Sequence, residues 1–197
     1  MAKTNVKMTM KLHEVAEIKT GITFRNRLLD NLDGEVEVIQ MRDVNSDLSI
    51  SSRLVRIGTE QIKAKHFLQP GQLILLAKGK YTKACQISPS EKKRVISSAF
   101  FSIRVKPAVK VLPAYLQWFL NLPQSESYFR SNASGTSMFS LPMSVLKNLD
   151  IAVPLLVVQE KIVHLIQDRE QEKTTLSALE EKKDAYLQQL MLHEVYK

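Results

Sequence analysis

The sequence predicts an α+β fold that consists of a mixed α/β domain over residues 1–154 and a long helix over residues 155–197. Two observations support this prediction. Up to Pro154, short apolar stretches with the spacing of strands and of short helices are separated by glycine, proline and polar turns. After Pro154 there is no glycine or proline, and apolar residues recur every three or four positions, as on one face of a helix.

The first part opens with a segment at helical spacing and continues with short strands. The apolar positions of residues 12–18 predict a helix. Residues 35–41 alternate between polar and apolar side chains over their first part, which is typical of a half-buried strand. The apolar run 73–77 follows a Pro-Gly pair and predicts a turn and then a buried strand. Residues 95–105 are rich in β-branched and aromatic side chains and predict another strand, with a bend at Ser97-Ser98.

Two helices and a last strand complete the first part. A proline suits the first turn of a helix over residues 113–122, and the next proline ends it. A second short helix is predicted over residues 124–130. A short helical turn begins at Ser144, and residues 151–153 predict a strand that stops at the following proline.

The second part is predicted as one amphipathic helix of roughly 35 residues from about Val157, hence about 50 Å long. A domain this small cannot bury such a helix, so the helix needs a partner helix; the alternative is that it packs back on its own domain. Arg169, Glu172 and Lys183 interrupt the apolar seam, and polar positions of this kind can set register and orientation. The residues predicted to pair, as an antiparallel coiled coil, are Ile162, Leu165, Ile166, Leu176, Leu179, Tyr186, Leu187 and Leu190.

The charge of the chain is concentrated in one stretch. The net charge is +8 at pH 7. Residues 76–110 hold nine basic residues and one acidic residue, and so account for the whole excess, whereas residues 159–197 carry a net charge of −2. An excess confined to one region favours a polyanion-binding face, and nucleic acid is the obvious polyanion. A solvated basic surface without a partner is the alternative.

The sequence predicts no catalytic site, no metal site and no cofactor. Cys85 is the only cysteine, and the four histidines have no second ligand at metal-binding spacing. There is no nucleophile elbow. Gly79-Lys80 resembles the end of a phosphate loop, but Gly71 is too far upstream and Tyr81 replaces the required hydroxyl residue. The first eleven residues lack the apolar core of a signal peptide, and no apolar run could span a bilayer, so we expect a cytoplasmic protein.

Three polar clusters are candidates for DNA contact. The connection 77–83 follows the predicted buried strand and combines lysines, a tyrosine and Gly79, whose lack of a side chain would let the backbone approach a duplex. The loop 132–137 offers short donors and acceptors, and residues 25–27 offer groups that can read guanine or adenine. A solvated hairpin and an ordinary turn are the alternatives for the first two clusters. The predicted DNA-binding residues are Arg25, Asn26, Arg27, Lys78, Lys80, Tyr81, Lys83, Ser134, Thr136 and Ser137.

The order of these elements resembles one repeat of the specificity subunit of type I restriction-modification systems, over nearly the whole chain. Six motifs in the family's order support the resemblance: Leu12–Gly21, Gln40–Val44, Pro70–Gly79, Tyr115–Asn121, Gly135-Thr136 with Leu141 and Leu146, and Ile151–Pro154 with Gln159–Val163. The sequence departs from the family at the junction, where Leu156 replaces a proline and Val158 an acid. These departures could change how the helix leaves the domain, but they do not affect the predicted recognition loops.

The resemblance implies a mechanism without catalysis by this chain. In the family, two target-recognition domains each read half of a split DNA site, two antiparallel helices separate them, and modification and restriction subunits supply methylation and cleavage. By this resemblance, residues 1–154 are a DNA target-recognition domain and residues 155–197 a dimerisation and spacer helix. With one domain and one helix, we expect a homodimer, because an antiparallel self-pairing satisfies two-fold symmetry. A helix of about 50 Å could separate two heads by about one DNA turn, ~34 Å.

Three other interpretations remain open from the sequence. The chain could be a truncated or shuffled half-subunit that needs another specificity chain. It could be an enzyme, such as a small nuclease or part of a methyltransferase. It could also be a coiled-coil adaptor whose basic patch is incidental.

Overall fold

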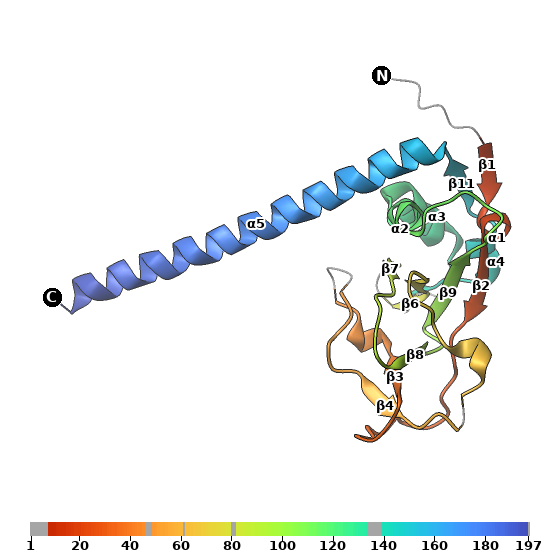
Figure 1. Cartoon of the computed structure of the whole chain (residues 1–197), viewed down its shortest axis with the longest axis horizontal. Helices are drawn as coiled ribbons and strands as arrows, with labels where there is room; N and C mark the ends of the chain where they lie inside the picture. Colours follow the sequence, from red (N-terminus) through yellow and green to blue (C-terminus); the bar gives the residue numbers. More distant parts are fainter. Residues whose placement is uncertain (1–7, 46–48, 61, 80–81, 134–138, 197) are drawn as a thin grey trace. The chain divides into compact units, whose positions relative to one another are not determined.

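The computed structural model describes residues 8–45, 49–60, 62–79, 82–133 and 139–196. It divides the chain into two compact units, Met1–Leu156 and Val157–Lys197. The first unit contains the strands and the short helices, and the second is formed by helix α5, Leu156–Val195, whose first residue lies in the first unit (Figure 1). The predicted α+β class is therefore confirmed, while the pairing of the long helix stays a prediction.

A four-stranded antiparallel sheet is the largest sheet of the described residues, with the strand order β2-β9-β5-β7. All four residues of β5 are buried, and so are the first four of β9, so this part of the sheet is covered on both faces. Burial on both faces explains why the β5 sequence is a continuous apolar run rather than an alternating one. The strands are β2 (Ala16–Thr20), β5 (Leu73–Leu76), β7 (Ala84–Gln86) and β9 (Phe100–Val105).

A smaller three-stranded sheet, in the order β4-β3-β8, carries a core of its own. Strand β3 (Val36–Ile39) runs parallel to β8 (Lys93–Ile96) and antiparallel to β4 (Val55–Ile57). Val36, Val38 and Val95 are buried in its centre. The predicted strands over residues 35–41 and 95–105 correspond to β3 and to β8 with β9, and the chain turns between β8 and β9 at residues 97–99.

Short helices and two further ladders complete the first unit. Strand β1 (Met8–Lys11) pairs antiparallel with β11 (Asp150–Val153), and Tyr115 of α2 (Pro113–Leu120) donates its hydroxyl to the carbonyl of Ala152 at 2.7 Å. The side-chain amide of Asn121 bonds both the backbone N–H and the carbonyl of Ala84 at 2.8 Å, which joins α2 to β7. The other elements are α1 (Leu12–Val15), α2 (Pro113–Leu120), α3 (Pro123–Asn132), α4 (Met143–Lys147), η1 (Met41–Asp43), η2 (Ala64–His66), β6 (Lys78–Gly79) and β10 (Phe139–Ser140).

Two sequence predictions need correction. The helix expected over residues 12–18 ends at Val15, because Ala16–Thr20 pair with β9 as strand β2. The local apolar spacing fits a helix, but all five residues pair with β9, and this tertiary pairing outweighs the local preference. The long helix has 40 residues rather than roughly 35, and its length is about 60 Å at the usual rise.

Candidate nucleic-acid interface

The segment that connects β2 to β3 presents the predicted cluster Arg25, Asn26 and Arg27. Its apolar residues Ile22, Phe24 and Leu28 pack against the core of the small sheet, whereas Arg25, Asn26 and Arg27 are exposed. The backbone at the start of this segment lies directly against the backbone at the end of β8, where the N–H of Ile22 donates to the carbonyl of Ile96 at 2.8 Å. A β-carbon at Gly21 would lie 2.2 Å from the carbonyl oxygen of Ser97, so only glycine fits there.

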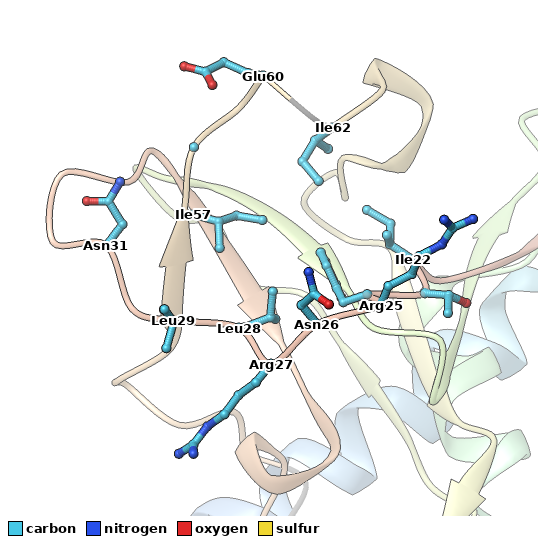
Figure 2. Close-up of a pocket in the computed structure, with 13 residues that line it drawn as sticks. Ile22, Arg25, Asn26, Arg27, Leu28, Leu29, Asn31, Ile57, Glu60 and Ile62 are labelled. Atoms are coloured by element: carbon cyan, nitrogen blue, oxygen red, sulfur yellow. The ribbon is translucent and has the colours of Figure 1, made fainter.

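This segment is the shared wall of two surface hollows. Asn26 and Arg27 line both hollows, whose volumes are about 640 Å³ and 370 Å³. Arg25 lines only the larger one. Figure 2 shows Arg25 and Arg27 extending to opposite sides of the segment, with Asn26 between them. A narrow ridge that carries two guanidinium groups and one amide is suited to contact phosphates on both sides and base edges at its crest.

The second hollow adds a cation that the sequence prediction did not include. Arg42 lines it, and its side chain is 64% exposed. The neighbouring Asp43 is buried, lies 3.7 Å from Arg42 Nε and accepts the backbone N–H of Gln40 at 2.8 Å, so it fixes the turn that carries Arg42. In the sequence, Arg42 stands out only as part of the motif Gln40–Val44. The sequence itself carries no signal that singles out Arg42, because the burial of Asp43 is seen only in the structure.

The connection 77–83 joins the antiparallel neighbours β5 and β7 as a hairpin, and within it Lys78 and Gly79 form a two-residue strand, β6, which pairs antiparallel with β10. Phe139 pairs with Gly79, and therefore the strands that flank two of the predicted binding loops are hydrogen-bonded to each other. Gly79 has a φ of 136°, and a β-carbon on it would lie 3.3 Å from Met41 Sδ. Gly79, the residue after exposed Lys78, therefore lies against Met41, the first residue of the turn that carries Arg42. Lys80, Tyr81, Ser134, Thr136 and Ser137 lie outside the described residues.

The cations of the basic stretch 76–110 are spread over several elements, and several of them bond to protein groups. Lys83 Nζ lies 3.9 Å from the Glu126 carboxylate. Lys92 and Lys106 donate to backbone carbonyls at 3.2 and 2.8 Å, and Arg94 pairs with Glu37 at 2.8 Å. The linear cluster is thus not one patch in the fold, and Lys83 is a weaker candidate for DNA contact than Lys78.

A second basic cluster appears only in the fold. Lys19 of β2 and Lys63 and Lys65 around η2 surround His66, and the pKa of His66 is lowered below 6.5 by burial first and then by these three lysines. Arg104 of β9 lines the same small depression as Lys19, Lys65 and His66. Lys63, Lys65 and His66 are neighbours in the sequence, whereas Lys19 and Arg104 come from the distant strands β2 and β9, so only the fold completes the cluster. Mutually repelling cations of this kind would gain from a phosphate.

The residues predicted to pair helices lie on α5, and most of them are exposed. Leu165 is 68% exposed and Tyr186 61%, while Ile162 and Ile166 are half-buried. A row of large apolar side chains in water is typical of a surface that a partner covers.

No metal centre is found within the described ranges. No group of three or more histidine, cysteine, aspartate or glutamate side chains there could hold a metal ion. Cys85 is buried in β7, and burial raises the pKa of its thiol to about 11, which disfavours the nucleophilic thiolate. As to membranes, no helix among the described residues combines the length and apolar character needed to cross one.

Comparisons with known proteins agree with the sequence resemblance. A family model described as the type I restriction modification DNA specificity domain matches residues 5–184. The chain is similar in fold to the type I S subunit from M. genitalium, with a TM-score of 0.59 and 13% identity over 87% of this chain and 41% of that one. For the HsdS subunit from Thermoanaerobacter tengcongensis the TM-score is 0.60, with 17% identity over 86% of this chain and 38% of that one.

A third solved structure, described as the basis of complex assembly and conformational transition of the type I R-M system, gives a TM-score of 0.64. It is 16% identical over 93% of this chain and 43% of that one. This chain therefore spans about two fifths of the length of these structures. No curated protein matches the sequence.

Proposed function

The chain belongs to the type I restriction-modification DNA specificity domain family, and from this premise we propose that it is a sequence-specific DNA-recognition subunit. Its first unit reads one half of a bipartite site in double-stranded DNA. It directs two partner subunits to this site: a modification subunit, which methylates the DNA, and a restriction subunit, which cleaves it. The chain itself carries no catalysis and acts with the cell's DNA in the cytoplasm.

The observation that best supports this function is the exposed Arg25-Asn26-Arg27 ridge between two hollows. Arginine guanidinium groups contact phosphates or read guanine, and asparagine reads adenine. Arg42 and Lys78 extend the ridge along the smaller hollow and the adjoining ladder. The cluster of Lys19, Lys63 and Lys65 supplies further positive charge on the same unit. The alternative of a basic patch without a partner does not explain why basic and amide groups line two adjoining hollows.

The second part of the proposal is a homodimer through α5. This sequence contains one sheet-rich unit and one long helix with exposed apolar residues. Two copies joined by antiparallel helices would place two recognition units about a DNA turn or more apart, since one turn is ~34 Å and the helix is about 60 Å long. The DNA site would then be an inverted repeat with a non-specific spacer.

The experiment that tests this function is selection of bound duplexes from a random-sequence library at about 0.1 M salt, with and without a modification subunit, because DNA affinity depends steeply on salt. We expect an inverted repeat with a fixed gap. A single ungapped motif would keep recognition and refute the dimer. No enrichment from folded protein in either condition would refute DNA recognition and favour the adaptor.

Two further measurements address the remaining alternatives. Cutting or methylation of DNA by the purified chain alone would establish an enzyme. Exchange of the dimer for a heterodimer when a longer specificity chain is added would favour the half-subunit that needs another chain.

A further inference from the structure

We propose that two copies of this chain pair through α5 in one antiparallel register, centred between Ser177 and Ala178, in which Glu172 of each copy lies beside Lys183 of the other. The inference rests on the proposed homodimer and makes it specific to residues. It follows from the order of charged and apolar side chains along one face of α5.

The pairing face of α5 follows a strict alternation of three-residue and four-residue steps, which keeps one stripe turned toward a partner helix. Every position of this seam from Leu165 onward is exposed in the described chain. Its charged members Arg169, Glu172 and Lys183 take part in none of the ion pairs found among the described residues. The seam consists of Ile162, Leu165, Arg169, Glu172, Leu176, Leu179, Lys183, Tyr186, Leu190 and His193.

A parallel pair of these helices is disfavoured by charge. In a parallel pair each seam residue lies opposite itself in the second copy. Arg169 would then meet Arg169, Glu172 would meet Glu172, and Lys183 would meet Lys183. Like charges juxtaposed at the core of an interface strongly disfavour association, so the second copy must run the other way.

In an antiparallel pair, the centre of the register is the point on the helix at which the two copies cross their two-fold axis. Seam residues of one copy lie opposite seam residues of the other only if this centre is shifted in steps of half a heptad. One of these registers gives every seam charge a favourable neighbour. With the centre between Ser177 and Ala178, leucines meet leucines in the layers on both sides of the centre. Glu172 meets Lys183, and Arg169 lies against the ring of Tyr186, a cation–π arrangement. The layers are Leu176 with Leu179, Glu172 with Lys183, Arg169 with Tyr186, Leu165 with Leu190, and Ile162 with His193.

The neighbouring registers are worse for identifiable reasons. With the centre at Thr174, every seam charge faces a leucine, because Lys183 meets Leu165, Glu172 meets Leu176 and Arg169 meets Leu179. With the centre at Glu181, Lys183 meets Leu179, Glu172 meets Leu190, and Arg169 meets His193. Desolvating these charges without a partner is unfavourable.

A centre between Glu170 and Gln171 does pair Arg169 with Glu172. However, it leaves Tyr186 and Leu190 opposite residues 155 and 151, which precede α5, so two exposed apolar side chains of each copy would lose their partners. The register centred between Ser177 and Ala178 is therefore the one that covers the apolar stripe and pairs its charges.

The first test uses charge reversal on the full chain, with the dimer dissociation constant measured by analytical ultracentrifugation. Glu172→Lys alone puts two Lys–Lys layers into the homodimer, and Lys183→Glu alone puts in two Glu–Glu layers. We expect each variant to raise the dissociation constant of the homodimer at least about tenfold. A mixture of the two variants should form a heterodimer as tight as the wild-type dimer, because both layers are again complementary. Glu181→Lys makes the same charge change on the outer face of α5 and should leave the dissociation constant unchanged.

The second test measures register directly by disulfide formation. Cys85 is buried, so an engineered cysteine is the reactive one. We expect a mixture of Leu165→Cys and Leu190→Cys to cross-link under mild oxidation, and each variant alone to remain uncross-linked, since residue 165 of one copy lies far along the helix from residue 165 of the other. The mixture of Leu165→Cys with Leu176→Cys is the matched control for the register that pairs Arg169 with Glu172.

The outcomes separate this inference from the proposed function. A wild-type chain that stays monomeric at high micromolar concentration would overturn the homodimer itself. A wild-type dimer that tolerates Glu172→Lys, or that cross-links position 165 to 176 rather than to 190, would overturn the register and leave the homodimer standing. Far-ultraviolet circular dichroism of each variant shows whether α5 is still helical, so a loss of pairing can be assigned to the seam.

Discussion

Arg94 of β8 and Glu37 of β3 lie opposite each other in the parallel ladder, and Arg94 Nε donates a 2.8 Å hydrogen bond to Glu37 Oε2. Both side chains are mostly buried. This arginine belongs to the basic stretch that first indicated DNA binding, yet it holds two strands together. The distinction between cations that support the fold and cations that face solvent determines which substitutions should affect which property.

Arg94→Ala should lower stability and leave DNA recognition intact. Removing one partner of a charged hydrogen bond leaves Glu37 without its cation, at an expected cost of ~1–2 kcal/mol in the free energy of unfolding after allowing for partial solvent exposure. Urea denaturation followed by circular dichroism measures this as a lower midpoint at an unchanged m-value. An unchanged midpoint, or a loss of DNA affinity in protein shown to be folded, would contradict the structural role.

Removing the cations of the ridge should do the reverse. Arg25→Ala, Arg27→Ala and Arg42→Ala are expected to leave the unfolding midpoint within error and to weaken DNA binding, because these side chains are exposed. Removing a residue that neutralises a phosphate should also reduce the slope of log affinity against log salt by roughly 0.9 for each phosphate concerned. Removing a residue that reads a base should instead relax the preference at one position of the selected site.

The matched control for these variants is Lys147→Ala, an exposed cation on α4 that lines neither of the two ridge hollows. Equally weakened DNA binding in Lys147→Ala and Arg27→Ala would show that net charge, and not the ridge, determines the affinity.

Gly79→Ala should disturb the ladder between β6 and β10. The φ of 136° is strained for alanine, and its β-carbon would contact Met41 Sδ at 3.3 Å. We expect a loss of roughly 1–3 kcal/mol of stability, measured by urea denaturation. Gly58→Ala is the matched control, since a β-carbon there meets nothing within 4 Å. A Gly79→Ala variant as stable as Gly58→Ala would refute the strained conformation.

The ring of His66 should titrate below 6.5 in the free chain, as measured by nuclear magnetic resonance, because burial and three nearby lysines disfavour its protonated form. Since its pKa is lower in the folded state than in the unfolded state, this group lowers stability as the pH falls from about 6.5 through the folded pKa. Lys63→Ala and Lys65→Ala should each raise the His66 pKa. Bound DNA should raise it as well if the cluster holds a phosphate, and an unchanged titration with saturating DNA would place the cluster outside the interface.

Cys85 should be inert in the native protein. Burial raises the pKa of its thiol to about 11, so at pH 8 the thiolate is scarce and shielded. A thiol-reactive dye should label the chain only after unfolding in urea, and the labelling rate then reports opening of β7. Rapid labelling of the native chain at pH 8 would contradict the burial of this side chain.

The sequence predicted the elements that local patterns specify and missed those that depend on distant partners. The apolar run of β5, the bend between β8 and β9, and the glycine-free α5 are local features, and the structure has them close to the predicted positions. Strand β2 was mistaken for part of a helix because its partner β9 lies more than eighty residues away in the chain. The two-residue strand β6 has too little sequence of its own to indicate its pairing with β10.

The candidate site follows the same rule. Arg25, Asn26 and Arg27 were identified because three adjacent polar residues stand out in the sequence. The two hollows that they line, the approach of Gly79 to Met41 and the addition of Lys19 and Arg104 to the cluster around His66 arise from the fold alone. The linear charge excess, in contrast, overstated the free positive surface, because Lys83, Lys92, Arg94 and Lys106 bond to neighbouring protein groups.

The division of the chain between Leu156 and Val157 has a consequence for recombination between genes that encode such chains. The proposed contacts with DNA lie in one unit, and the proposed contacts with a second copy lie in the other. A gene exchange that replaces only the coding sequence for the first unit would then create a chain with a new target that still pairs with the old one. Cells that carry several such chains would hold more specificities than genes for them, because mixed dimers of the proposed kind would read hybrid sites that neither parent reads.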